Sequence, residues 1–72
     1  MNEFITDLNT AAANFDTADP RTAKPAITMF KSSKALMDAV TGRAELGQQR
    51  AAMQLWSKLH QAAAAAEKDG GS

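Results

Sequence analysis

Side chains able to act as nucleophiles, general bases or metal ligands are few and scattered in this sequence. The chain has one His, no Cys and no Tyr. No Gly-x-Ser-x-Gly motif surrounds Ser32, Ser33 or Ser57, so none of them has the context of a hydrolase nucleophile. His60 has no second His or Cys with which to hold a metal ion, and we interpret it as a half-exposed structural residue. The sequence therefore predicts a protein that is not an enzyme and that uses no cofactor.

The acidic residues and glycines likewise match no ligand-binding loop. Asp16 and Asp19 are close together, but the Gly and the distal Glu of a calcium loop do not follow them. We expect them to have turn or capping roles instead. Gly42 and Gly47 fit neither G-x-G-x-x-G nor the phosphate-binding loop of nucleotide hydrolases. No metal or nucleotide site is therefore predicted.

A row of contact residues in the last third of the chain is the stronger signal. Gln49, Met53, Trp56 and His60 follow a 4-3-4 spacing, which places them along one side of a helix. Trp and Met are enriched at protein interfaces, and Trp is a frequent hot spot. Two interpretations stay open, since Met53 and Trp56 either pack inside the monomer or contact a partner. The predicted protein interface comprises Arg50, Ala52, Met53, Leu55, Trp56, Lys58, Leu59, His60 and Ala62.

The element that would position this row is an Ala-rich helix predicted over residues 44–67. It carries a seam with strict 4-3-4-3-4 spacing, the pattern of a coiled coil. The seam consists of Gln48, Ala52, Leu55, Leu59, Ala62 and Ala66. Because so small a chain has a thin core, we predict self-association through Ala52, Leu55, Leu59 and Ala62, most simply as a homodimer. Residues 70–72 are predicted to form a flexible tail.

Two further helices are predicted before this one. Residues 3–16 carry Phe4, Leu8 and Phe15 at helical spacing, with Asn2 as the expected N-cap. Residues 17–24 form a proline-containing connector. A helix over residues 25–41 then presents a 4-3-4-3 stripe. The stripe consists of Ala26, Phe30, Ser33, Met37 and Val40.

The junction between the second and third helices can be read in two ways. Gly42 is suited to end one helix, and Thr41 could then cap the next. Alternatively, a single helix runs from residue 25 to residue 67 and tolerates Gly42 and Gly47 in its interior. We favour a break or kink within residues 42–47.

Length and composition limit the fold to one small all-α domain spanning residues 1–69. The chain has 72 residues, of which 44% are hydrophobic, and helix formers dominate over β-branched and aromatic residues. We expect a small helical bundle or helical hairpin of two to three helices, ending in the long Ala-rich helix. Without Cys there is no disulfide to stabilise so small a core, which makes stabilisation by a partner protein the remaining route.

Charge and targeting signals restrict the partners. The chain carries 8 basic and 8 acidic residues, and a strong nucleic-acid binder is usually basic overall. Residues 1–20 are acidic, whereas residues 21–60 carry an excess of Lys and Arg. No stretch is long and apolar enough to cross a membrane or to act as a signal peptide, so we expect the cytoplasm, or the host cytoplasm if the gene is viral.

Together these features predict a non-catalytic protein-binding module. It would act as a small inhibitor, adaptor or regulator of a larger protein through one helical face, in the manner of phage accessory proteins. Arg50 and Lys58 would steer a partner with an acidic surface. Two alternatives remain: a structural subunit or assembly chaperone of a helical assembly, and a small nucleic-acid-binding regulator.

Overall fold

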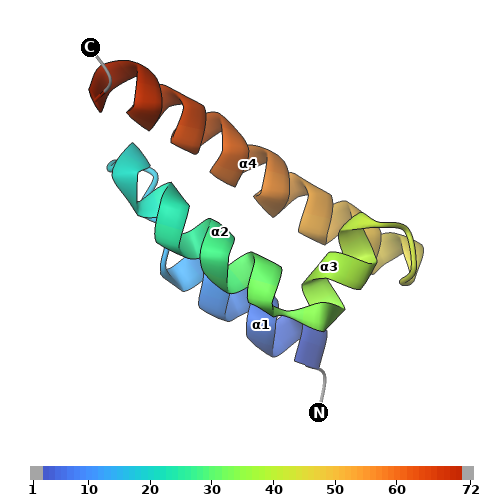
Figure 1. Cartoon of the computed structure of the whole chain (residues 1–72). Helices are drawn as coiled ribbons and strands as arrows, with labels where there is room; N and C mark the ends of the chain where they lie inside the picture. The colour runs from blue at the N-terminus through green and yellow to red at the C-terminus, as the bar shows by residue number, and fades with distance from the viewer. Residues whose placement is uncertain (1–2, 71–72) are drawn as a thin grey trace.

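Four α-helices and one short 3-10 helix make up the fold, which the computed structural model describes for residues 3–70 (Figure 1). The elements in chain order are α1 (Glu3–Ala13), η1 (Pro20–Thr22), α2 (Ala23–Ser32), α3 (Lys34–Val40) and α4 (Leu46–Gly70). No strand occurs among the described residues, so the all-α bundle is confirmed. There are more helices than the two or three expected, because the predicted helix 25–41 is divided. Asn2 as a helix cap and the tail at residues 71–72 lie outside the described residues.

The first helix ends three residues before the predicted boundary at residue 16. The Asn14 side chain donates to the Thr10 carbonyl at 2.8 Å, and Asp16 accepts from the Ala18 amide at 2.9 Å. Short polar side chains of this kind offer the backbone an alternative to the helix. Phe15 consequently lies just outside α1, where it still packs against the core.

The connector is held by its own hydrogen bonds. Asp19 caps η1, since its carboxylate accepts from the Arg21 amide at 3.1 Å and from Arg21 Nε at 3.2 Å. These hydrogen bonds hold the pKa of Asp19 below its ordinary value. The Thr22 hydroxyl accepts from the Asp16 amide at 2.8 Å and donates to the Asp19 carbonyl at 2.7 Å. Asp16 and Asp19 thus have the turn and capping roles expected of them, and α2 begins two residues earlier than predicted.

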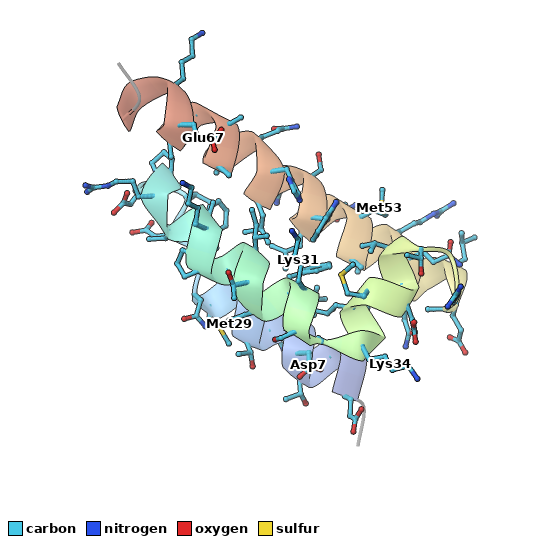
Figure 2. All side chains as sticks on the ribbon, viewed as in Figure 1. Asp7, Met29, Lys31, Lys34, Met53 and Glu67 are labelled. Atoms are coloured by element: carbon cyan, nitrogen blue, oxygen red, sulfur yellow. The ribbon has the colours of Figure 1, made fainter. Side chains whose placement is uncertain are left out.

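Ser33 divides the predicted helix 25–41 into α2 and α3. Its backbone is extended, with φ −93° and ψ 116°, and its hydroxyl accepts from the Leu36 amide as the N-cap of α3. The same hydroxyl donates to Asp7 of α1 at 2.7 Å. Asp7 lies on α1 beneath the corner where α2 meets α3 (Figure 2). The expectation of a continuous helix was therefore wrong, because a long-range polar contact holds the break.

Gly42 ends α3 and turns the chain toward α4, which confirms the expected break. Gly42 has φ +83°. The Arg43 amide donates to Asp38 O at 2.8 Å and the Gly42 amide to Ala39 O at 3.3 Å, the hydrogen bonds of a Schellman motif. Thr41 does not cap the next helix, since it is the C-cap of α3 and its hydroxyl donates to carbonyls within that helix. Instead α4 runs from residue 46 to residue 70, rather than from 44 to 67.

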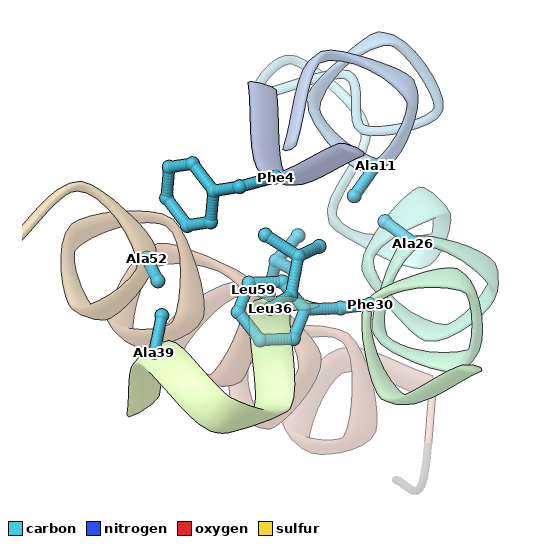
Figure 3. Close-up of a cluster of buried hydrophobic side chains, with 8 residues drawn as sticks. All are labelled: Phe4, Ala11, Ala26, Phe30, Leu36, Ala39, Ala52 and Leu59. Carbon is cyan, nitrogen blue, oxygen red and sulfur yellow. The ribbon is translucent and has the colours of Figure 1, made fainter. Parts of the chain in front are cut away.

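The four helices enclose one apolar core (Figure 3). Phe30, Leu36 and Leu59 are its largest fully buried side chains. Alanines on every helix fill the remaining positions and allow the helices to approach closely. In Figure 1, α2 and α3 lie against α4, and α1 packs chiefly against α2 and α3 and also contacts α4. The buried core consists of Phe4, Ala11, Ala26, Phe30, Leu36, Ala39, Ala52 and Leu59.

Candidate protein-binding surface

The predicted coiled-coil seam of α4 faces the interior of the chain's own bundle. Ala52 and Leu59 are fully buried, and Leu55 and Ala62 are half-buried. The chain's own α2 and α3 provide the apolar surface that this seam requires. Ala52 and Leu59 are therefore not accessible to a second molecule in this fold, and self-association would need a different surface from the one predicted.

A second row of residues runs along α4 one position further on in the sequence. We call it the outer row, and it consists of Leu46, Gln49, Met53, Trp56 and His60. Its 3-4-3-4 spacing repeats the pattern of the buried seam. The row itself lies at the edge of the bundle, because it is offset around the helix from the seam. Leu46 is 63% exposed and Met53 is 48% exposed, while His60 is also exposed and Gln49 and Trp56 are half-buried.

Leu46 belongs to this row but was not among the predicted interface residues. It lies three residues before Gln49, so extending the 4-3-4 spacing backwards would have included it. The other strongly exposed large apolar residue, Ile5, belongs to α1 and not to α4.

Trp56 links the outer row to the core. Its ring lies 4.9 Å from the Phe30 ring, centroid to centroid, with an interplanar angle of 47°. The His60 ring lies 4.2 Å from Trp56 at 57°. Tilted aromatic pairs at these distances are favourable. Trp56 therefore packs inside the monomer, as the first of the two interpretations expected, and it is half-buried at the edge of the bundle.

The basic residues around the outer row differ in part from those predicted. Arg50 is exposed and lies one turn before Met53, about 60° around the helix. Lys58 is exposed but lies about 140° around α4 from Met53, so it does not flank the row. Lys31 of α2 does flank it, because its neighbour Phe30 packs on Trp56 and because its side chain lies between α2 and α4 in Figure 2. Sequence reasoning missed Lys31, since only the fold brings α2 beside α4.

Two open hollows lie on the surface of the described residues. One, of about 540 Å³, lies between α1, α3 and the start of α4, and mixed charges line it, including Asp38, Arg43 and Glu45. The other, of about 120 Å³, lies between α1 and α2 beside Asp7 and Ser33. Among the described side chains, those of residues 3–68, no three His, Cys, Asp or Glu gather as metal ligands would. No helix within the described part of the chain has the length and apolar character needed to cross a bilayer.

No protein-family model, curated protein or solved structure matches the chain.

Proposed function

We propose that this chain is a non-catalytic protein-binding module that acts as a small inhibitor, adaptor or regulator of a larger protein. The binding surface is the outer row of α4. One observation carries this proposal: Leu46 and Met53 are strongly exposed on the same side of a helix that also presents Trp56. Exposed apolar residues that line up in this way are typical of interaction surfaces, whereas singly scattered ones are ordinary.

The scaffold beneath the row supports this function. The buried seam fixes α4 against α2 and α3, so the outer row is presented on a rigid helix. Trp56 is held between Phe30 and His60 and loses little side-chain freedom when a partner covers it. Covering the exposed half of Met53 and of Leu46 would contribute roughly 1 kcal/mol each, at about 2 kcal/mol for a whole side chain. We propose the monomer as the binding unit and the cytoplasm as its location.

Site-specific photo-crosslinking tests this function. A crosslinking amino acid at position 53 should give a discrete heterologous adduct in the cells that produce the protein. The same group at position 58, about 140° around the exposed side of α4, should not. Trp56→Ala combined with the crosslinker at position 53 should abolish the adduct while the helical circular dichroism signal persists. If positions 53 and 58 give the same adducts, the outer row is not the binding surface.

A further inference from the structure

We propose that the partner presents an acidic amphipathic helix of about four turns, which lies along α4 with Lys31 on one side and Arg50 on the other. This inference rests on the proposed function and specifies the partner of that same surface. It commits to a helix with apolar residues along one side and carboxylates on its flanks.

The spacing of the outer row indicates a helical occupant. Leu46 and His60 are fourteen residues apart, which corresponds to about 21 Å along α4. Between them the 3-4-3-4 spacing is the one by which a helix receives the apolar row of another helix. The buried seam of α4 uses the same spacing to pack against α2 and α3 inside the chain. A second amphipathic helix on the outer row would repeat that packing on the neighbouring side of α4.

The charges on both sides of the row are positive. Lys24 and Lys31 are seven residues apart, so they share one side of α2, and both are exposed. Arg50 is exposed on the opposite side of the row. The described structure shows no ion pair for any of these three residues, and Arg21 with Asp19 is the only pair that it contains. Glutamates or aspartates on a docked helix would therefore find free cationic partners.

The acidic residues of the chain lie elsewhere. Asp38 and Glu45 line the hollow between α1, α3 and the start of α4, and Asp7 lines the hollow between α1 and α2. Within the described side chains, Glu67 continues the line of the outer row, but two turns beyond His60. The stretch from Leu46 to His60 itself contains no acidic residue, and Glu45 adjoins only its first turn. That arrangement favours an acidic partner by charge complementarity.

The same charges disfavour two other occupants. In a symmetric dimer through the outer row, the basic flanks of one copy would meet those of the other, and like charges in contact oppose association. A nucleic acid would satisfy Lys31 and Arg50 but would leave the aliphatic side chains of Leu46 and Met53 without an apolar partner. Only a helix with both an apolar row and acidic flanks uses all of these residues.

A peptide-preference experiment tests the inference. The probes are two synthetic peptides of about 16 residues with identical leucines at heptad positions, one with Glu and one with Lys at the flanking positions. Trp56 is the only Trp in the chain, so its fluorescence reports on occupancy of the outer row. The acidic peptide should bind at least tenfold more tightly than the basic one, and Met53→Asp should weaken it at least tenfold.

Charge reversal supplies the matched control. The variant that combines Lys31→Glu with Arg50→Glu should bind the basic peptide more tightly than the acidic one. Lys58→Glu, on the far side of α4, should keep the wild-type preference. A single-stranded oligonucleotide should not displace the acidic peptide.

Three outcomes would overturn the inference: neither peptide binds with a Kd below about 1 mM, Lys58→Glu changes the preference as much as the double variant does, or the oligonucleotide competes equally. Dimerisation of the free chain that Met53→Asp abolishes would also overturn it, since a second copy would then occupy the row. A heterologous adduct at position 53 together with any of the first three outcomes would leave the proposed function standing and reject only the acidic helix.

Discussion

Ser33→Ala removes the hydroxyl group that joins three elements of the fold. Ser33 is 7% exposed, ends α2, caps α3 and donates a 2.7 Å hydrogen bond to Asp7 of α1. Alanine fits the same space and favours a continuous helix through the corner. The substitution therefore tests whether this hydroxyl, rather than apolar packing, maintains the break between α2 and α3.

The expected loss follows from the two hydrogen bonds. Losing a serine N-cap costs about 1 kcal/mol, and losing a hydrogen bond to a carboxylate costs about 1.5–3 kcal/mol. Because one hydroxyl makes both hydrogen bonds, the losses are not fully additive, and we expect Ser33→Ala to lower the free energy of unfolding by about 2–3 kcal/mol. A domain of this length has roughly 4–11 kcal/mol in total. The melting temperature should fall by roughly 10–20 °C.

Urea and thermal unfolding followed by circular dichroism measure this loss. Ser32→Ala is the matched control, because Ser32 is the adjacent residue and its exposed hydroxyl donates only to the Met29 carbonyl at 2.8 Å. It should change the free energy of unfolding by less than about 0.5 kcal/mol. Combining Ser33→Ala with Asp7→Ala should cost less than the sum of the two single changes. Equal stabilities for Ser33→Ala and Ser32→Ala would refute the reasoning.

Three more predictions concern stability. Gly42→Ala should destabilise by about 1 kcal/mol because Gly42 has φ +83°, whereas Gly47→Ala, in α4 with open space around it, should stabilise by about 0.5–1 kcal/mol; thermal melts of both variants check the sign. Leu59→Ala should cost about 2–5 kcal/mol in urea unfolding, since Leu59 is fully buried. The hydrogen bonds from Arg21 lower the pKa of Asp19 in the folded protein. The ionised Asp19 carboxylate therefore stabilises the fold above about pH 4, and this stabilisation is lost as the pH falls through the lowered pKa of the folded state. Acid titration of the unfolding midpoint should show this loss in the wild type, and Asp19→Asn should lack it.

The helical class and the path of the chain could be predicted because they depend on local signals. Pro20 and Gly42 mark the two turns, and the apolar spacing within each segment identifies the helices. The division at Ser33 could not be predicted in this way. Ser33 belongs to a regular 4-3-4-3 stripe that predicts one uninterrupted helix over residues 25–41. The group that holds the break, the Asp7 carboxylate, is 26 residues away. Only the fold places α1 beneath that corner.

The proposed binding surface was predictable in part for a related reason. Met53, Trp56 and His60 were identified by type and spacing, and the fold places them on one side of α4. Lys31 could not be identified, since its position beside Trp56 depends on how α2 packs against α4. Lys58 was predicted to flank the surface because it is close to Met53 in the sequence. Five residues, however, turn a helix by about 140° beyond one full turn, so Lys58 lies away from the outer row.

Two apolar rows, offset by one residue, compete for the same interior on α4, and side-chain size explains which one is buried. In the buried seam, Ala52 and Leu59 are fully buried and the positions between and beyond them are half-buried, so α2 and α3 can approach α4 closely. The outer row has Met53 where the buried seam has Ala52, and Trp56 where it has Leu55, and these larger side chains would hold the helices apart. A chain with few large residues gains more from close packing of small ones than from burying Trp56 completely. The row that is too bulky for this interior therefore remains at the edge of the bundle, where we propose that another protein binds it.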